Sequence, residues 1–409
     1  MRILKENHQG FSTTLAFALI PLSGFATDIY LPSLPAMARD LQISAAEAQL
    51  SLVLFMFSLG VSQAFIGSIL DSFGRYRIGV AALAVFSLTS FVIALVPDIH
   101  VIYIMRVIQG LMISLVVVGK RAYFVDLFSG EKLKHYISLF SIIWACAPIM
   151  APFLGGYLQS LFGWRSNFYF LGFFSLMFMV LELIYSGESL KHPHPFKTKA
   201  ITQVYGNMLR TADFTLGVII IGICFGQVVI YSLSSPFIIQ RVFGHSPVVS
   251  GYSSLLAGIS VMTGGIIAKS LIKLPLARKV TAALTIQLSL SLLMTLTSTF
   301  SSNIYTLVGF TMGIHIAGGF IFNIIYGYCL SRFSKNAATA SGLTGGVMYV
   351  VSSMFSYGLA NLLAVKSQAL LGAANITMVL AVIVLFIAFN RYSLARQPQP
   401  VLRPEPAVS

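Results

Sequence analysis

The sequence predicts an all-α integral membrane protein with twelve transmembrane helices, and three observations support this fold class. Only 9% of the 409 residues are charged, whereas about 25% are charged in ordinary soluble domains. Apolar runs of about 20 residues, which suffice to cross about 30 Å of hydrocarbon, recur along the chain. About 21 of the 26 lysine and arginine residues lie in alternate connections between these runs or at the chain ends, which is the positive-inside bias of cytoplasmic segments.

The apolar runs place the twelve expected helices. In chain order they cover residues 12–32, 46–70, 77–96, 100–120, 136–160, 166–186, 213–240, 249–272, 280–299, 302–330, 337–364 and 369–391. The first run follows two basic residues, as a signal peptide would, but it lacks a small-residue cleavage site, so we expect it to remain as a helix. The three cysteines all fall inside apolar runs, which favours packing over disulfide bonds.

A polar interruption divides the expected helices into two groups of six. Residues 1–190 form the N-terminal half, 191–212 a cytoplasmic central loop, and 213–392 the C-terminal half. With the N-terminus inside, about 21 of the 26 basic residues lie on the cytoplasmic side, so both termini are predicted to be cytoplasmic. Residues 393–409 are polar and rich in proline, and we expect a disordered cytoplasmic tail.

Two charged residues lie inside expected helices of the N-terminal half. Asp28 lies near the outer end of the first helix. Burial favours the protonated form of a carboxyl group, so Asp28 is a candidate proton carrier; the alternative is an interfacial aspartate that water keeps ionised. Arg106 stays charged and needs carbonyls, water or a carboxylate. It is a candidate to hold Asp28 ionised until a proton or a substrate intervenes, and the alternative is a side chain that snorkels to the surface.

The turn between the second and third expected helices reads G-S-I-L-D-S-F-G-R-Y-R at residues 67–77. Its basic residues cannot stay in hydrocarbon, so the turn lies at a membrane face. Gly67 and Gly74 permit a close helix approach and a tight backbone bend.

The fifth expected helix contains A-P-I-M-A-P-F-L-G-G at residues 147–156. Pro148 and Pro152 each remove a helical hydrogen-bond donor, while Gly155 and Gly156 expose backbone to a neighbour. We expect a neighbouring helix to slide against this surface in a rocking contact. A helix that is merely kinked is the alternative.

Further polar side chains interrupt the apolar runs and are candidates to line a cavity for a mostly apolar ligand. They are Tyr30, Gln109, Gln227, Tyr231, His315, Asn323 and Tyr326. Each one alone is equally consistent with a hydrogen bond between helices. For His315 a satisfied structural histidine is favoured over a proton relay. For Glu182, near the cytoplasmic end of its helix, snorkelling into the headgroups is favoured over proton coupling.

Composition and motifs exclude several function classes. The net charge of +14 follows the positive-inside bias and does not indicate nucleic acid as a partner. The sequence contains no recognisable nucleotide-binding loop, metal cluster or nucleophile constellation, so we expect no enzyme, no cofactor and no metal. An ATP-driven pump needs a large nucleotide-binding domain, and no polar stretch is long enough to form one. Transport must therefore draw on an ion gradient or on the gradient of the substrate.

Taken together, the motifs resemble those of the bicyclomycin-resistance (Bcr/CflA) type of drug:proton antiporter in the major facilitator superfamily. The matching segments are T-D-I-Y-L-P-S-L-P (27–35), Gln49, the turn at 67–77, R-V-I-Q-G (106–110), K-R-A-Y-F-V-D (120–126), the proline and glycine motif at 147–156, G-W-R (163–165), E-S-L (188–190) and S-P-F-I-I-Q-R-V-F-G-H-S-P (235–247). The match is dense from about residue 20 to 250 and thin thereafter.

This resemblance implies twelve-helix alternating access, proton-coupled export and a location in the cytoplasmic (inner) membrane of a bacterium. Asp28 and Arg106 match positions that the family uses in proton and substrate coupling. The turn at 67–77 implies a cytoplasmic gate. The gate residues are Gly67, Asp71, Gly74, Arg75 and Arg77.

We expect this gate to close the cytoplasmic face in an outward-open state. Asp71 is expected near the N-terminus of residues 77–96, or of a helix in the other half, where backbone donors favour an anion. Arg75 or Arg77 is expected to pair with a nearby acid such as Asp126.

The leading hypothesis is a proton-coupled antiporter that exports small, largely apolar or cationic compounds. Its expected partners are the substrate, protons and the lipid bilayer, and we expect a monomer. The turn departs from the family pattern, however, because Ser72 replaces an arginine, Ser68 replaces a proline and Tyr76 interrupts a double arginine. A dedicated exporter or importer of one metabolite, such as a siderophore or a peptide, therefore remains the alternative. A membrane sensor or scaffold that does not transport is a distant third.

Overall fold

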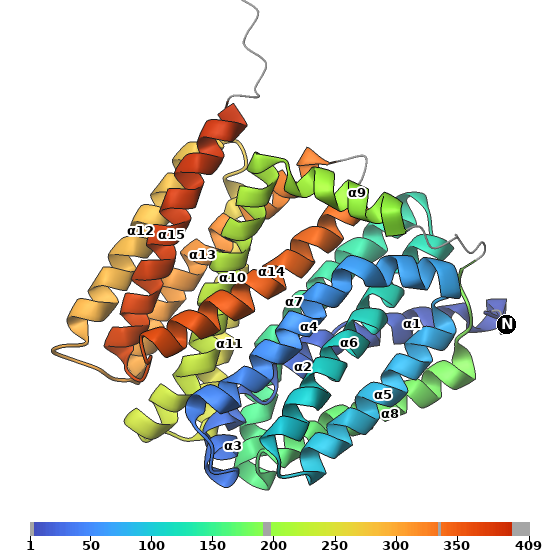
Figure 1. Cartoon of the computed structure of the whole chain (residues 1–409), viewed down its shortest axis with the longest axis horizontal. Helices are drawn as coiled ribbons and strands as arrows, with labels where there is room; N and C mark the ends of the chain where they lie inside the picture. Colours follow the sequence, from blue (N-terminus) through green and yellow to red (C-terminus); the bar gives the residue numbers. More distant parts are fainter. Residues whose placement is uncertain (1–3, 191–197, 334–336, 395–409) are drawn as a thin grey trace, which may run out of the picture.

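The computed structural model describes residues 4–190, 198–333 and 337–394, and this part of the chain is a bundle of long helices (Figure 1). The elements are η1 (Glu6–His8), α1 (Gln9–Leu19), α2 (Leu22–Asp28), η2 (Leu31–Ser33), α3 (Leu34–Asp40), α4 (Ala45–Phe73), α5 (Tyr76–Leu95), α6 (Ile99–Leu127), α7 (Gly130–Phe162), α8 (Arg165–Tyr185), α9 (Thr198–Leu209), α10 (Ala212–Phe237), η3 (Ile238–Val242), α11 (Pro247–Ser270), α12 (Leu276–Thr297), α13 (Ile304–Arg332), α14 (Ala337–Leu362) and α15 (Gln368–Leu394).

Eleven helical runs within the described residues are long and apolar enough to span a membrane. They correspond to eleven of the twelve expected helices. The remaining expected helix, residues 136–160, lies within α7, one continuous helix of 33 residues. The central segment differs from expectation, because the predicted loop at 191–212 contains the helix α9. Of the predicted tail, residues 395–409 lie outside the described part of the chain.

The first membrane run is longer than predicted and is broken. The sequence predicts a helix at 12–32, whereas the run covers Glu6–Asp40 and consists of η1, α1, α2, η2 and α3. Proline has no N–H, so the carbonyl four residues before it loses its helical partner. Pro21 therefore separates α1 from α2, and Pro32 follows the end of α2 at Asp28. The chain departs from α-helical geometry at Tyr30, two residues after Asp28.

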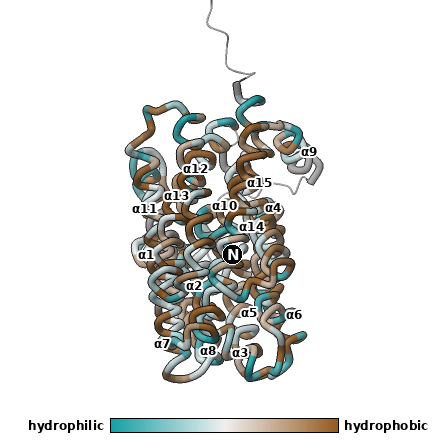
Figure 2. The backbone as a smooth tube through the Cα atoms, turned by 90° about the vertical axis from the view of Figure 1, so that its left-hand side faces the viewer, coloured by the Kyte–Doolittle hydropathy of each residue, from teal (hydrophilic) through white to brown (hydrophobic). Residues whose placement is uncertain are grey.

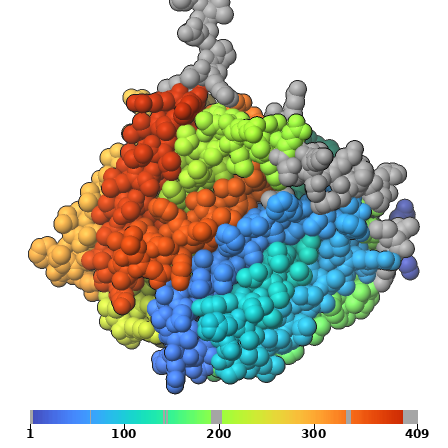
Figure 3. Space-filling view, viewed as in Figure 1, coloured from blue at the N-terminus to red at the C-terminus, as the bar shows by residue number. Residues whose placement is uncertain are grey.

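Two groups of helices pack against each other. Helices α1–α8 contact chiefly one another, and so do α10–α15. Two long pairs join the groups, since α4 lies along α14 and α7 lies along α11. Figure 1 shows α4 (blue) and α14 (orange) side by side across the middle of the molecule. In the space-filling view the blue and cyan helices occupy the lower right, and the orange and red helices the left (Figure 3).

The outer surface is apolar, as lipid contact requires. Leu88, Leu161 and Val384 are each more than 60% exposed. Hydrophobic residues follow the length of the helices, and many hydrophilic residues lie in the connections at the two ends (Figure 2). We call the end at which α4 gives way to α5 the basic face, and the opposite end the far face.

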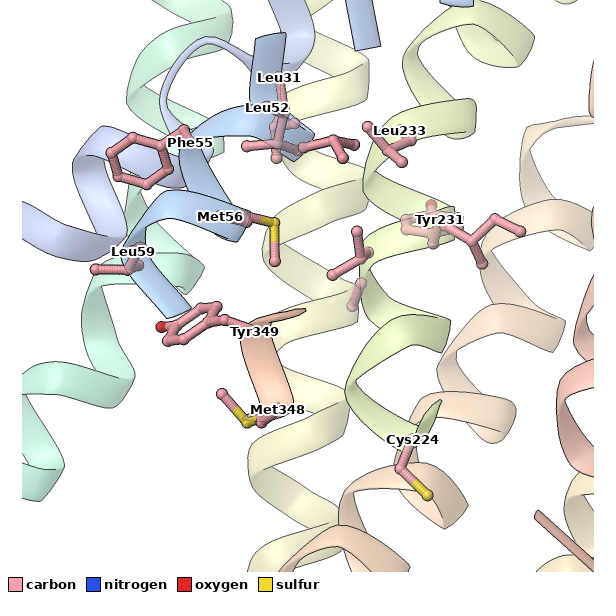
Figure 4. Packing of buried hydrophobic residues seen from close by; sticks show 14 of the residues in the cluster. Leu31, Leu52, Phe55, Met56, Leu59, Cys224, Tyr231, Leu233, Met348 and Tyr349 are labelled. Carbon is pink, nitrogen blue, oxygen red and sulfur yellow. The ribbon is translucent and has the colours of Figure 1, made fainter. Parts of the chain in front are cut away.

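Buried apolar and aromatic side chains fill the region where the two groups of helices meet (Figure 4). Helix α4 contributes Met56, helix α10 contributes Leu233, and helix α14 contributes Met348 and Tyr349. The charged residues of the site described next border this region.

Candidate functional site

Arg106 of α6 binds the broken end of the first membrane run. Its guanidinium donates two hydrogen bonds of 3.0 Å to the carbonyl oxygen of Ala26, in the last turn of α2. The last carbonyls of a helix lack helical donors and form the negative end of its dipole, so a cation is stabilising there. Arg106 therefore caps α2 next to Asp28.

Other contacts of Arg106 satisfy its charge inside the protein. Its Nη1 donates to Oε1 of Gln109 at 2.8 Å, and its Nε donates to the carbonyl of Ser51 at 3.4 Å. Its guanidinium carbon lies 4.6 Å from the ring centre of Tyr30 and 4.2 Å from that of Phe55, within reach of cation–π attraction. Because Arg106 is 0% exposed, it does not snorkel to the surface.

Tyr30 and Gln109, which the sequence assigns to a substrate cavity, lie around Arg106. Both are fully buried. The Nε2 of Gln109, whose Oε1 accepts from Arg106, donates a hydrogen bond of 2.9 Å to the hydroxyl of Ser90. The hydroxyl of Tyr30 lies 3.1 Å from that of Ser51. These bonds hold the two side chains that surround the guanidinium.

Asp28 lies inside the first membrane run, and not near its outer end as predicted, because the run continues to Asp40. Its side chain is partly exposed. Asp28 ends α2, which contacts α4, α6 and α7 of the first group, and the following η2 contacts α10 and α11 of the second group. Asp28 therefore lies near the region where the two groups of helices meet. The hydrogen bonds of Arg106 described above go to two carbonyls and an amide, so Arg106 acts on Asp28 through space.

Three other predicted cavity residues form a cluster in the second group of helices. The rings of Tyr231 and His315 meet edge to face, with their centres 5.4 Å apart. Gln227, one turn before Tyr231, accepts a hydrogen bond of 2.7 Å from Gln287 of α12. All four side chains are buried. The Nδ1 atom of His315 has no hydrogen-bond partner within the described residues, and the preference for a structural histidine over a proton relay stays a prediction.

Asn323 and Tyr326 lie further along α13 and have different partners. Asn323 donates to the carbonyl of Gly319 at 2.8 Å, and the hydroxyl of Tyr326 lies 3.3 Å from that of Ser341 in α14. The seven predicted cavity residues thus occupy three places: around Arg106, around His315 and near the end of α13.

At the basic face, two carboxylates hold Arg75. Its Nη2 lies 2.7 Å from Oδ1 of Asp71, and its Nη1 forms an ion pair with Asp126. The pairing with Asp126 that the sequence suggests is therefore present. Gly74 makes the bend between α4 and α5 with φ 91°, a backbone conformation that favours glycine.

The carboxylate at the N-terminus of α5 is that of Glu188, and not that of Asp71 as predicted. Glu188 accepts hydrogen bonds of 3.0 Å and 3.1 Å from the backbone N–H groups of Arg75 and Tyr76. Asp71 lies in the last turn of α4, four residues before Arg75, so its carboxylate reaches that side chain first. The next residue, Ser189, donates to Asp126 at 2.8 Å. The E-S-L segment is the sequence signal for these contacts.

Two predicted gate residues do not behave as expected. No atom lies within 4 Å of the position that a Cβ on Gly67 would take, so Gly67 makes no close helix approach. Arg77 is exposed, and the ion pairs of this turn involve Arg75 instead. The gate contacts described above stay within the first group of helices.

Hydrogen bonds also cross between the two groups of helices at the far face. Gln49 of α4 donates to the carbonyl of Leu233 in α10 at 2.8 Å, and Gln240 of η3 donates to the carbonyl of Pro32 at 2.7 Å. Both glutamines belong to the motifs quoted above. At this face, the motifs of the two groups therefore bind each other.

Helix α7 is continuous through Pro148 and Pro152 and lies between α2 and α11. A Cβ on Gly155 would overlap the carbonyl oxygen of Ile29, and one on Gly156 would lie 2.8 Å from the carbonyl oxygen of Pro247. The two glycines let α7 approach the broken first run and the second group of helices at once. The expected close contact is present, and its rocking remains a prediction.

We expect Gly155→Ala to lower both stability and transport, because the new Cβ must displace the Ile29 carbonyl beside Asp28. Overpacking of this kind costs about 1–3 kcal/mol. Gly309→Ala in α13 is the matched control, since no atom lies within 4 Å of its Cβ position. The apparent Tm of the purified protein and its transport in vesicles measure the effect. Equal values for the two variants would contradict the close contact.

Glu182 is buried in α8, and its Oε2 lies 2.7 Å from Nζ of Lys120 in α6. The predicted snorkelling is therefore wrong, because a local hydropathy pattern does not show that a lysine of another helix faces the carboxylate.

Within the described residues, no group of three His, Cys, Asp or Glu side chains is placed to hold a metal ion.

Comparison with known proteins adds to this geometry. The sequence profile of the Major Facilitator Superfamily matches residues 16–357. The uncharacterised MFS-type transporter YdgK of Bacillus subtilis is 28% identical over 80% of this chain and 83% of its own length. The multidrug resistance protein MdtL of Vibrio parahaemolyticus is 25% identical over 94% of this chain and 95% of its own.

A shorter match and the solved structures agree with these similarities. A bicyclomycin resistance protein homologue of Haemophilus influenzae is 32% identical over 42% of this chain and 43% of its own length. A bacterial homologue of the human lysosomal transporter Spinster, in an inward-facing and unoccupied conformation, has a TM-score of 0.69 at 14% identity. That likeness covers 96% of this chain and 97% of the other, and it concerns the fold alone.

Proposed function

The chain belongs to the Major Facilitator Superfamily, and we propose that it is a proton-coupled antiporter that exports small, largely apolar or cationic compounds. The observation that carries this proposal is the position of Asp28. It ends α2 at a break in a membrane run, beside a fully buried arginine and next to η2, which contacts the second group of helices. Discontinuous membrane helices at such an interface form the substrate and coupling-ion sites of many secondary transporters.

Proton coupling follows from the chemistry of this site. Arg106 is a fixed charge, because its hydrogen bonds and aromatic neighbours hold it in place. Asp28 is a weak acid that is partly exposed within the run, so its carboxyl group can exchange a proton with water that enters the protein. A cationic substrate and a proton then compete for one carboxylate, which couples their opposite movements.

The interior suits largely apolar ligands. Met56 and Met348 lie in the meeting region of the two groups, together with Tyr349 (Figure 4). Methionine adapts to irregular ligand shapes, and aromatic faces attract cations. The names of two relatives, a multidrug resistance protein and a bicyclomycin resistance protein homologue, support the same class of substrate.

We propose that α7 is the twelfth membrane helix and that the two groups are the halves that rock against each other. The hydrogen bonds at the far face favour a conformation that is closed there. In this proposal the basic face is cytoplasmic, both termini lie there, and a monomer acts in the bacterial inner membrane. The concentration of lysine and arginine supports this orientation.

A dedicated exporter of one metabolite remains the second candidate. The observation that favours it is the altered turn, in which Ser68, Ser72 and Tyr76 replace the family residues. The direct test is transport in everted vesicles with an imposed pH gradient, acid inside. We expect a lipophilic quaternary-ammonium dye to accumulate and to be released by a protonophore. The multidrug proposal would be overturned if a polar metabolite accumulated under the gradient while cationic and neutral apolar probes did not.

A further inference from the structure

A small cavity lies inside the first group of helices, apart from Asp28 and behind the gate. Its volume is about 20 Å³. The side chains that line it include Arg75, Tyr76, Lys120, Tyr123, Glu182 and Ser186. Thus α5, α6 and α8 border a mainly apolar space that two basic side chains and one acidic side chain reach.

The ion pair in this cavity leaves one carboxylate oxygen unused. Oε2 of Glu182 lies 2.7 Å from Nζ of Lys120, and the two side chains are 3% and 14% exposed. Oε1 of Glu182 is buried and has no hydrogen-bond partner within the described residues. A buried charge without full hydrogen bonding is costly, so a partner is expected for this oxygen.

Arg75 carries the complementary unused donor. Its two terminal nitrogens bind Asp71 and Asp126, whereas its Nε is buried and has no partner among the described residues. Arg75 and Glu182 line the same cavity. A volume of about 10–15 Å³ is enough for one water molecule, and a buried water needs two to four polar partners.

We propose that this cavity is an internal water site through which the Lys120–Glu182 pair positions Arg75. The water accepts the Nε–H of Arg75 and donates to Oε1 of Glu182. Lys120 holds the carboxylate from the other side, so a chain of polar contacts runs from α6 and α8 to the gate. Lys120 and Glu182 are positioning residues, because they act on the gate through Arg75. This inference rests on the proposed function, in which the turn at 67–77 is the gate.

The consequence is a coupling between the inside of the first group and the basic face. Asp71 and Asp126 fix the terminal nitrogens of Arg75, and the water fixes the third side of its guanidinium. When Glu182 loses its charge, Arg75 loses this third contact. The turn at 67–77 is then held less firmly in the form that must meet the second group of helices when the basic face closes, so closure is less favoured. Coupling between such sites typically changes an equilibrium about 5- to 150-fold.

The test measures the gate directly. Spin labels on Ser129→Cys and Ser331→Cys, both exposed ends of helices at the basic face, report the distance between the two groups in a variant without native cysteines. We expect Glu182→Gln to shift the distance distribution toward the open basic face. It should slow turnover several-fold with ligand affinity unchanged. Glu131→Gln removes the exposed pair with Lys134 and is the matched control, expected to behave as the wild type.

Two further variants separate the possible failures. Asp71→Asn alters the gate itself and should shift the distances in the same direction. If Asp71→Asn shifts them and Glu182→Gln does not, the inference is overturned while the gate stands. If neither does, the gating part of the proposed function fails, and the inference fails with it. The double variant Lys120→Gln and Glu182→Gln removes both charges of the buried pair, so it leaves no unpaired buried charge. If Glu182→Gln alone folds poorly, a shift of the label distances in the double variant still shows that this pair positions Arg75.

The water itself is a separate observable. A density map of the wild type in which ordered solvent is visible should show one water within hydrogen-bond distance of Nε of Arg75 and Oε1 of Glu182. A dry cavity would overturn the water bridge.

Discussion

Asp28→Asn is expected to abolish gradient-driven efflux while the protein stays folded and inserted. Asparagine cannot bind or release a proton at neutral pH, so the exchange of proton for substrate stops. The side chain is partly exposed at the end of α2, and an isosteric amide there does not disturb packing. In everted vesicles with an imposed pH gradient, uptake should fall to the level of vesicles without the protein. Exchange of substrate down its own gradient should persist.

Asp98→Asn is the matched control for this charge removal. Asp98 caps α6 and accepts a hydrogen bond of 2.7 Å from the N–H of His100, and asparagine caps helices about as well as aspartate. We expect this variant to transport at the wild-type rate. Undiminished gradient-driven uptake by Asp28→Asn would exclude Asp28 from proton coupling.

Arg106→Ala is expected to lose transport and to lower the apparent Tm. The change removes the hydrogen bonds to the Ala26 carbonyl and to Gln109 and leaves these groups unpaired in a buried space. An unsatisfied buried polar group costs about 1–3 kcal/mol. The end of α2 also loses the cation that caps it, so the backbone beside Asp28 becomes less fixed. Thermal unfolding in detergent and transport in everted vesicles measure the two effects.

Arg106→Lys should recover only part of the activity. A lysine keeps the charge but lacks the planar fork that reaches Ala26 and Gln109 together. Arg39→Ala is the matched control, because Arg39 is exposed in α3 of the same membrane run. Wild-type efflux, ligand affinity and Tm in the Arg106→Ala variant would show that the buried arginine has no role in the site.

Some contacts of the site are predictable because they are local. The bend at Gly74 follows from a glycine between two helices, and the bond between Asp71 and Arg75 follows from their spacing of four residues. In each case the relevant partner, or the steric requirement, lies within a few residues of the sequence.

Other contacts depend on how helices far apart in the sequence are rotated and tilted. Glu188 accepts a hydrogen bond at the N-terminus of α5 from the N–H of Arg75, which lies 113 residues away in the sequence. Glu182, which its own helix suggests as a surface residue, is buried because it pairs with Lys120 of another helix. The first run continues through its breaks to Asp40. No pattern within one helix indicates which of these acids reaches which donor.

The sequence by itself determined the class of this protein: a polytopic helical membrane protein with motifs of the major facilitator superfamily. Hydropathy and run length depend only on neighbouring residues, so both can be evaluated without knowledge of the fold. Only the tertiary structure decided that Arg106 caps α2 at the carbonyl of Ala26, with Asp28 beside it and unbonded to it. The reason is that an arginine with several polar groups in reach selects its partners by geometry, and geometry is fixed only when the helices pack.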